Sequence, residues 1–390
     1  MTNTSEIIAE KLLSLSRKFG SEHADVLITK GRNNSVEVRE GELEQIEGSD
    51  SLSVSLRVIN NQKSAIVSCS DASIESLEQM TKRATEIANE SIPNPFIGLA
   101  NSSDLAQQST KASIDLSEPE ELILNDPLKL KDMALKAEKA ALNSEGISKT
   151  DGSSASSSQH ELLLATSNGF SDSYNKSSYA IVASAISTCG SKMERDYAFE
   201  QRVYLEDLPR PETIGLLAAK RAKMMQGAKK PVTGNYPVIF HERISGSIVS
   251  HILAAINGEA IARGSSWLLD GINNKILPEN VSLIEDPHLP RMSGSRPFDA
   301  EGLPTSKNFF VRNGILKSWI LDLKTSRQLG LKSTGNASRS ASGPPSPGTG
   351  NVELKGGDKG LNDLLKEAGE GLMVCSLIGS SINPNNGDYS

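Results

Sequence analysis

The strongest constraint on the fold is an alternation of apolar and polar residues in a long segment near the start of the chain. Within residues 24–71 the alternation is clearest at Leu52, Val54, Leu56 and Val58. Period-two alternation puts every second side chain on the same face, which is typical of a strand with one buried side. Turn residues separate this run from its neighbours, so the segment predicts a meander of strands.

Helical periodicity flanks the meander and returns later in the chain. Residues 5–19 place their apolar side chains on one broad face. Asp71 is expected to cap a second helix, and Asp126, followed by a proline, is expected to start a third. A fourth helix is predicted at 211–226. Helices beside a strand meander predict an α+β fold.

Further strands and loops follow from local composition. The polar run KTDGSSASSSQ (149–159) predicts a flexible loop, and the runs ELLLATSNG and YAIVASAISTCG after it predict strands. Residues 241–264 predict one helix, since isoleucines recur four residues apart. From about residue 281 the pattern indicates short strands and glycine turns. The segment 91–120, interrupted by Pro and Ser, predicts a surface connection.

The length of 390 residues predicts more than one domain, because single cores stop growing at roughly 250–300 residues. We expect an N-terminal α+β domain at 1–120, a central helix and strand region at 121–230, and a β-rich C-terminal domain at 231–390. The net charge of −7 and an aromatic content of 4% argue against a nucleic-acid partner, which usually meets a basic face.

Cysteine usage and hydropathy bear on the compartment. Cys69, Cys189 and Cys375 are scattered and lack metal-knuckle spacing, which fits a reducing cytosol. No run of 18 apolar residues exists, so no membrane span is expected. We therefore expect a cytoplasmic protein without a membrane partner.

His241 and Glu242 are weak catalytic candidates because they start like the zinc-peptidase signature HExxH. The residue four positions after His241 is Ser245, and the next histidine is His251. Ten residues of helix rise about 15 Å, whereas two zinc ligands both lie about 2 Å from one ion. The two histidines therefore cannot share a metal on a regular helix, and packed, hydrogen-bonded histidines are the competing interpretation.

A second candidate is the loop IEDPHLPRMSGSRPFDAEG. Asp286, His288, Asp299 and Glu301 could form a metal site with oxygen and nitrogen ligands, although their spacing does not demand one. The alternative is a shaped loop in which Arg296 and Asp299 form charge-assisted bonds. We expect no metal to be bound by this chain.

Two loops are candidates for peptide binding. The loop STGNASRSASGPPSPGTGN (333–351) lacks a phosphate-loop pattern, and its glycines and prolines favour an extended segment that contacts a peptide backbone. Arg296 and Arg339 could meet a peptide carboxylate, with Asp299 orienting Arg296. The alternative is that these residues only brace a turn.

The C-terminal 160 residues carry several longer motifs. Quoted as they stand, these are HILAAINGEAIARGSSWL, EDPHLPRMSGSRPFDAEGLPT, LDLKTSRQLGLKSTGNASR, PPSPGTGNVEL and GLMVCSLIGSSINPNNGDYS. In wording, order and spacing they resemble the PmbA (TldE) branch of the TldD/PmbA family, also called modulator of DNA gyrase. The N-terminal half resembles the family more loosely, through VSCSDASIESLEQMTKRATEIA.

The resemblance implies a cytosolic protein with a two-domain α+β fold, a mixed N-terminal domain and a β-rich C-terminal domain. It implies a heterodimer of a TldD-like and a PmbA-like subunit that acts as a zinc-dependent peptidase on unfolded or flexible peptides. Antitoxins and precursors of peptide antibiotics are among the implied substrates. The resemblance further implies that the zinc is held by the TldD-like subunit, and we expect this chain to form a homodimer when isolated.

The catalytic branch of the family carries HExxxH and a later cysteine ligand. Transferred to this sequence, the second histidine would be Gly246, and the cysteine is expected beyond GDYS, where the sequence stops. Cys375 stands in a strand-like run and is not that ligand. Family members continue past GDYS with glycine-rich strands, so the C-terminal domain is expected to be incomplete. The resemblance therefore implies the non-catalytic partner.

Two other functions stay open from the residues. One is a self-sufficient metallopeptidase that uses His241, Glu242 and a ligand from the His288 loop. The other is a peptide-binding scaffold without any catalytic role. Metal analysis separates the metallopeptidase from the rest, and association with a TldD-like protein separates the subunit from the scaffold.

Overall fold

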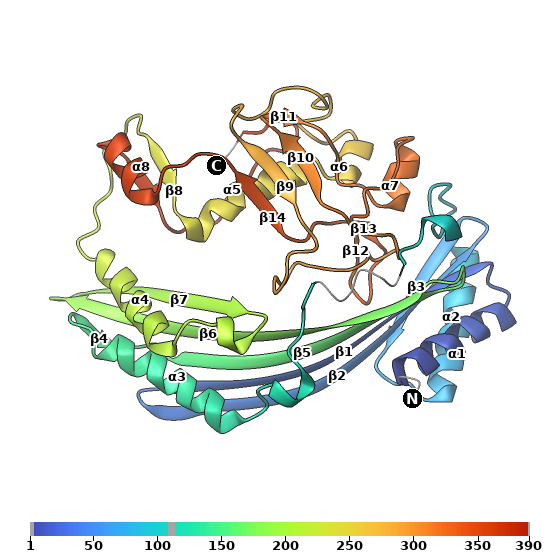
Figure 1. Cartoon of the computed structure of the whole chain (residues 1–390), viewed down its shortest axis with the longest axis horizontal. Coiled ribbons are helices and arrows are strands. Elements are labelled where there is room, and N and C mark those ends of the chain that lie inside the picture. Colours follow the sequence, from blue (N-terminus) through green and yellow to red (C-terminus); the bar gives the residue numbers. More distant parts are fainter. Residues whose placement is uncertain (1–3, 108–113, 389–390) are drawn as a thin grey trace.

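The computed structural model describes residues 4–107 and 114–388. A long curved sheet forms the lower part of the molecule, and a C-terminal domain lies over its concave face (Figure 1). The predicted two-domain α+β fold with a β-rich C-terminal domain is confirmed. Residues 108–113 of the predicted surface connection, and the last two residues of the GDYS motif, lie outside the described part.

The large sheet has seven strands in the order β3-β2-β1-β5-β6-β4, with β7 also paired to β6. All of its pairs are antiparallel. The longest strands have 19 residues and so extend about 60 Å. Their bounds are β1 His23–Arg39, β2 Glu42–Asn60, β3 Lys63–Cys69, β4 Ile147–Lys149, β5 Ser153–Thr166, β6 Ser171–Cys189 and β7 Lys192–Arg202. The β1–β5 pair joins the predicted meander to the central region in one sheet.

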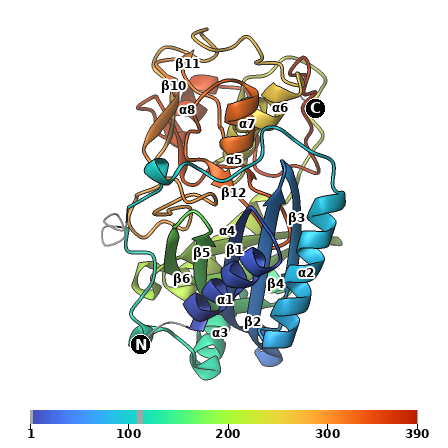
Figure 2. The same ribbon diagram turned by 90° about the vertical axis from the view of Figure 1, so that its right-hand side faces the viewer.

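Four helices cover the convex face of this sheet (Figure 1). They are α1 Thr4–Lys18, α2 Ile74–Glu90, α3 Pro127–Leu142 and α4 Pro211–Met224. Figure 2 shows α1 and α2 at the end of the sheet formed by β1–β3. The alternating Val54, Leu56 and Val58 are fully buried beneath these two helices. Shorter helical turns lie at Ser102–Asp104, Glu120–Leu122 and Leu205–Asp207.

The predicted loop at 149–159 is wrong, because β5 begins at Ser153 between β1 and β6 in the middle of the sheet. Ala155 packs in the core beneath α3, so a small side chain is what fits there. The serines beside it point alternately to the two faces. Two neighbouring strands supply the backbone hydrogen bonds, which outweighs the weak strand preference of a serine run.

The helix starts agree with the sequence in one case and differ in another. Asp126 caps α3 by accepting the Leu128 amide at 2.9 Å, as predicted. The predicted cap of α2 at Asp71 is wrong, because Ser73 is the cap. Asp71 instead accepts the Ser73 amide and hydroxyl and so positions that cap.

Close contact between α3 and α4 depends on Gly215. A Cβ built there would lie 2.0 Å from the Ala137 carbonyl oxygen. We expect Gly215→Ala to lower the free energy of unfolding by about 1–3 kcal/mol, because the helices must move apart in a packed core. Urea denaturation of the variant checks this.

The matched control is Gly246→Ala. Gly246 is exposed in α5 and has open space around its Cβ position, so alanine should stabilise by about 0.5–1 kcal/mol through helix propensity. Equal effects of the two substitutions would contradict the proposed role of close helix packing.

The C-terminal domain combines short strands and helices around its own core. It contains a four-stranded sheet in the order β11-β10-β9-β14, the pair β12–β13, and the parallel pair β15–β8. The strands are β8 Val238–Phe240, β9 Ser282–Glu285, β10 Asn308–Arg312, β11 Ile315–Leu316, β12 Ala337–Ser338, β13 Ser346–Pro347, β14 Val352–Lys355 and β15 Leu372–Val374. The helices are α5 Glu242–Ala255, α6 Gly258–Ala262, α7 Leu323–Gln328 and α8 Leu361–Ala368.

The single helix predicted at 241–264 is wrong, since the chain breaks after Ala255 and restarts as α6. The Asn257 side chain caps α6 by accepting the Glu259 amide at 2.9 Å. Gly258 donates its amide to the Ile320 carbonyl, in space that a Cβ would not fit. Tertiary contact with the chain around Ile320 therefore interrupts a helical sequence pattern.

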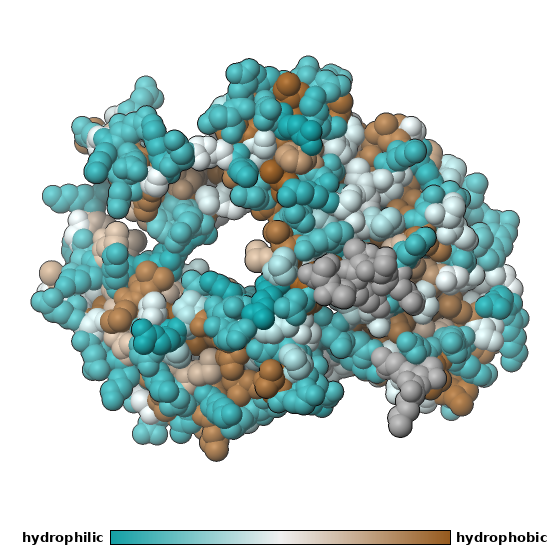
Figure 3. All heavy atoms as spheres, viewed as in Figure 1, coloured by the Kyte–Doolittle hydropathy of each residue, from teal (hydrophilic) through white to brown (hydrophobic). Residues whose placement is uncertain are grey.

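Arginines of the C-terminal domain hold it over the sheet and its connections. Arg243 forms a bidentate pair with Asp196 on β7, and Arg327 donates to the Phe96 and Leu99 carbonyls. Between these attachment regions an opening passes through the molecule (Figure 3). The opening lies between α5 and β14 on one side and β6 and β7 on the other (Figure 1). Within the described residues, no helix is both long and apolar enough to cross a membrane.

Candidate functional site

The structure places His241 at the start of α5 as its N-cap. The Nδ1 atom accepts the Arg243 amide at 3.3 Å, which is a structural use of the imidazole. Glu242 is exposed in the first helical turn, and the next turn presents Gly246 where the zinc motif would need histidine. His241 and Glu242 are thus adjacent, and His251, the other histidine of α5, is about 15 Å along the helix axis from His241 and out of reach of a shared ion.

The four candidate ligands of the His288 loop, which are Asp286, His288, Asp299 and Glu301, have separate hydrogen-bond or ion-pair partners. Nε2 of His288 lies 2.9 Å from the Thr305 hydroxyl, and Asp286 forms an ion pair with Lys307 at 3.0 Å. Among residues 4–107 and 114–388, no three His, Cys, Asp or Glu side chains are grouped to hold a metal ion. The four loop residues are therefore not brought together as one set of ligands.

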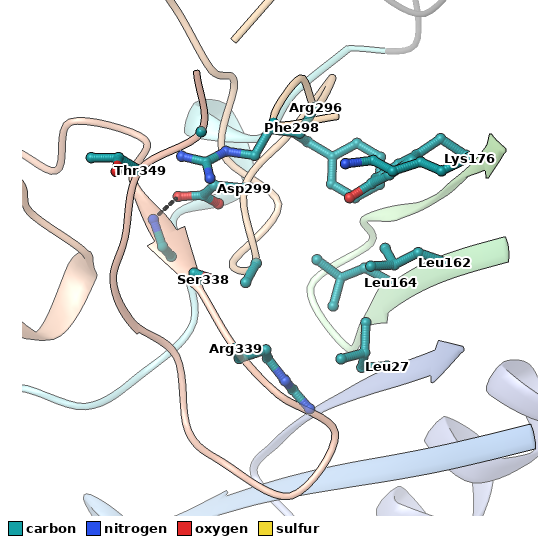
Figure 4. Close-up of a pocket in the computed structure, with 15 residues that line it drawn as sticks. Leu27, Leu162, Leu164, Lys176, Arg296, Phe298, Asp299, Ser338, Arg339 and Thr349 are labelled. Carbon is teal, nitrogen blue, oxygen red and sulfur yellow. Dashed lines mark hydrogen bonds between the residues drawn. The ribbon is translucent and has the colours of Figure 1, made fainter. Parts of the chain in front are cut away.

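The predicted loops meet at a pocket between the concave face of the sheet and the C-terminal domain (Figure 4). Its cavity volume is about 240 Å³. Arg296, Asp299 and Arg339, the three predicted peptide-binding residues, all line it. The remaining lining residues are Leu27, Leu162, Leu164, Tyr174, Lys176, Gly294, Phe298, Ala300, Ala337, Ser338, Thr349 and Gly350.

The predicted Arg296–Asp299 bond is wrong. Asp299 accepts the backbone amides of Glu301, Leu303 and Ala337 at 2.9–3.1 Å. Arg296 instead pairs with Glu285, 3.3 Å from Nη2 to Oε1. Asp299 therefore fixes the backbone of two loops, and it does not orient the Arg296 guanidinium by a direct bond.

Arg339 reaches below the pocket into a buried ionic cluster with Asp25 and Arg57. Its Nη1 pairs with Asp25, and its Nη2 donates to the Ser55 hydroxyl at 3.2 Å. Arg57 bonds the other oxygen of Asp25, with Nε at 2.6 Å. Burial alone would raise the pKa of Asp25, but the two guanidinium charges outweigh it and hold that pKa below its usual value. The carboxylate that Arg339 meets is therefore one of the same chain.

Lys176 is the pocket residue that sequence reasoning missed. It stands on β6, and its Nζ donates to the Ser293 carbonyl at 2.9 Å. Burial, together with the charge of Arg296, lowers the pKa of Lys176 to about 8. The sequence carried one signal, because Tyr174, Lys176 and Ser178 stand two residues apart in a strand-like run and therefore share a face. Only the position of β6 in the sheet shows that this face meets loops more than 100 residues away in the chain.

Hydroxyl groups cover much of the concave face beyond the pocket. Residues directly opposite in antiparallel strands share a face, so the pairs Ser156–Ser35 and Ser158–Ser178 lie on the same side as Lys176 and Leu162. The serines assigned to this face by register include Ser35, Ser49, Ser51, Ser53, Ser55, Ser154, Ser156, Ser158 and Ser178. The face thus offers many uncharged donors and acceptors, which suit a peptide backbone more than one specific side chain.

Three models of one family match the chain in sequence order. They are described as PmbA/TldA metallopeptidase domain 1 at residues 24–88, the central domain at 117–226 and the C-terminal domain at 233–390. Among curated proteins, the chain is 31% identical over 371 residues to the metalloprotease PmbA of Escherichia coli O157:H7, a match that covers 95% of this chain and 79% of that protein.

Solved structures give the same fold. One is a crystal structure from Bacteroides thetaiotaomicron described as a modulator of DNA gyrase, with a TM-score of 0.90, 24% identity, and coverage of 100% of this chain and 85% of that one. Another is TldE from Thermococcus kodakarensis, with a TM-score of 0.85, 22% identity, and coverage of 98% and 85%. At these identities the likeness concerns the fold alone.

Proposed function

Because the chain belongs to the PmbA/TldD metallopeptidase family, in its PmbA/TldE branch, we propose that it is the non-catalytic subunit of a zinc-dependent peptidase. A TldD-like partner subunit supplies the zinc and the chemical step. This chain supplies a surface on which an unfolded or flexible peptide lies while it is cut. Antitoxins and precursors of peptide antibiotics are substrates of the proposed class, and the proposed location is the cytoplasm.

The observation that carries this proposal is the environment of His241. Its Nδ1 is engaged by the Arg243 amide, and Gly246 stands where a second ligand would be needed. The chain's own residues therefore contribute through binding and not through metal chemistry. The hydroxyl-covered concave face supports the peptide-binding part, because main-chain hydrogen bonds give affinity without strict sequence demands.

The test is reconstitution with a TldD-like subunit from the same source. Alone, the chain should contain no stoichiometric zinc, leave a flexible labelled peptide intact, and run as a homodimer in light scattering, since related subunits often share interfaces. Mixed with the partner, it should form a heterodimer whose zinc-dependent cleavage exceeds the background by at least about a hundredfold. A chelator should abolish that cleavage.

His241→Asn is the matched variant. Asparagine is an equally good helix cap but cannot replace an imidazole in catalysis, so the pair should keep its full rate. A loss of rate, or one tightly bound zinc in the isolated chain, would instead indicate the self-sufficient metallopeptidase. Peptide binding without any gain from the partner would indicate the scaffold.

A further inference from the structure

The pocket at Lys176 has one apolar wall and one cationic wall. The apolar wall is built by Leu27, Leu162 and Leu164 from β1 and β5, and by Phe298, whose ring meets Tyr174 edge to face at 5.3 Å. Arg296 and Ser338 lie opposite the leucines in Figure 4, and Lys176 lies above Leu162 and Leu164 in that view. A ligand for this pocket therefore needs both an apolar body and a negative group.

The two cations at the pocket, Lys176 and Arg296, differ in how they are neutralised, because Arg296 pairs with Glu285. In the part of the chain that the structure describes, Lys176 has no carboxylate partner, and its Nζ donates to the Ser293 carbonyl. The Nε atom of Arg296 is buried and lacks a hydrogen-bond partner among the described residues. Burial and, second, the charge of Arg296 disfavour the charged form of Lys176, which lowers its pKa.

Glu285, the carboxylate that pairs with Arg296, also accepts two closer uncharged donors. Oε1 of Glu285 accepts the Gly350 amide at 2.6 Å, and Oε2 accepts the Asn336 side chain at 2.5 Å. The Arg296 contact is longer, at 3.3 Å. Arg339 shares Asp25 with Arg57, and the Asp299 carboxylate, which accepts three backbone amides, lies in the field of Arg296. Among the described residues, the pocket cation without a carboxylate partner is therefore Lys176, while Arg296 beside it keeps its pair with Glu285.

The size of the pocket limits the ligand. Its 240 Å³ equals about eight water volumes, enough for one amino-acid residue and its terminal group. Gly294 and Gly350 bring two loops together behind Arg296, where a Cβ on Gly350 would lie 2.3 Å from the Gly294 carbonyl oxygen. The close approach of Gly294 and Gly350 closes the pocket on that side.

We propose that this pocket binds the free C-terminal residue of a peptide whose last side chain is apolar. The terminal carboxylate lies between Lys176 and Arg296, and the last side chain packs on Leu27, Leu162 and Leu164. The preceding residues run over the adjacent hydroxyls of the concave face, such as Ser158 and Ser178. This inference rests on the proposed function, because it names the end of the peptide that this subunit holds.

The experiment measures binding of short labelled peptides to the isolated chain by fluorescence anisotropy. The probes are one peptide ending in leucine with a free carboxylate, the same peptide as a C-terminal amide, and one ending in aspartate. The free leucine acid should bind about tenfold to a hundredfold more tightly than the amide, as expected for a charge-assisted bond in a buried site. The aspartate peptide should bind at least about tenfold more weakly, because a second carboxylate would enter the apolar wall.

Lys176→Met is the decisive variant, since it keeps the apolar stem and removes the charge. It should abolish the preference for acid over amide, an effect that a merely structural role would not produce. Lys355→Met, at an exposed lysine on β14 of the C-terminal domain, should leave the preference unchanged. Arg296→Lys, which keeps a cation beside Glu285, should bind the acid more weakly without unfolding.

Several results would overturn the inference. They are equal binding of acid and amide, an acid preference that survives Lys176→Met, and competition by free leucine as strong as that by the peptide. None of these three binding results would contradict the proposed function if the reconstituted pair of subunits still assembles and cleaves peptide. Conversely, if the chain fails to pair with a TldD-like subunit, the proposed function is refuted, whereas the measured preference for a free C-terminal carboxylate remains valid.

Discussion

Asp25→Asn is expected to lower the free energy of unfolding by about 3–5 kcal/mol, because it leaves two arginines buried around a neutral group. Asp25 is 1% exposed and bonds both Arg57 from the sheet and Arg339 from the C-terminal domain. The side chains of both arginines are almost fully buried as well. Urea denaturation, followed by a probe for each domain, measures the loss.

A double-mutant cycle locates the cause. Arg339→Met leaves the Asp25–Arg57 pair intact, so the double variant should cost clearly less than the sum of the two single variants. Arg32→Met is the matched control, since its pair with Asp50 is exposed and exposed pairs contribute at most about 1 kcal/mol. A cost of Asp25→Asn no larger than that of Arg32→Met would refute the importance of the cluster.

The cluster also explains why the second domain sits where it does. Arg339 is in the loop that the sequence marked as extended and rich in glycine and proline, and its guanidinium reaches the face of the sheet beside the pocket. The same loop supplies Ser338, Thr349 and Gly350 to the pocket lining. The ionic cluster thus fixes the loop on which the proposed peptide site depends.

The sequence predicted elements whose burial is local. The period-two run around Val54 and Leu56 and the Asp126 cap could be read directly, because each depends on residues nearby in the chain. The strand at Ser153–Thr166 could not, since a serine run becomes a strand only when β1 and β6 pair with it. The break after Ala255 likewise depends on Ile320, more than sixty residues away.

For the candidate site, too, the sequence predicted which residues take part but not which partners they contact. Residue type alone singled out Arg296, Asp299 and Arg339, and the structure brings all three to one pocket. Their bonding partners lay beyond sequence reasoning, because Glu285 and Asp25 are distant in the chain. The peptide-binding role of the three residues stays a prediction. Substitution of Lys176, the fourth polar residue of the pocket considered for this role, is its most direct test.

Stability should fall as pH rises from the ordinary glutamate range toward 8, and Glu301 should be the main cause. Burial and, second, the charge of the nearby Asp299 raise the pKa of Glu301 to about 8. Burial also raises the pKa of Asp299 to about 6. Arg57 opposes the shift of Glu301 but does not cancel it.

The sign follows from proton binding. An acid whose pKa is higher in the folded state keeps its proton there while the unfolded chain has lost it, so its stabilisation is complete below the unfolded pKa and is lost as pH rises through the folded pKa. Each such group can cost up to about 1.4 kcal/mol per pH unit within this window. Asp25 acts in the opposite direction, because its lowered pKa stabilises the fold above its unfolded value and stops doing so only in acid.

Glu301→Gln isolates the effect, because glutamine stays neutral and its side-chain oxygen can still accept the Leu323 amide that Glu301 accepts at 2.8 Å. We expect the variant to lose much of the decline in unfolding free energy between pH 5 and 8, measured by urea titrations at each pH, and to be more stable than the parent at the alkaline end. Glu353→Gln, at an exposed position on β14, should keep the parent's slope. If Glu301→Gln also keeps that slope, the titrating group lies elsewhere. Ionisation of Glu301 would place a second buried carboxylate charge beside Asp299, which the attraction of Arg57 and the bond to the Leu323 amide offset only in part.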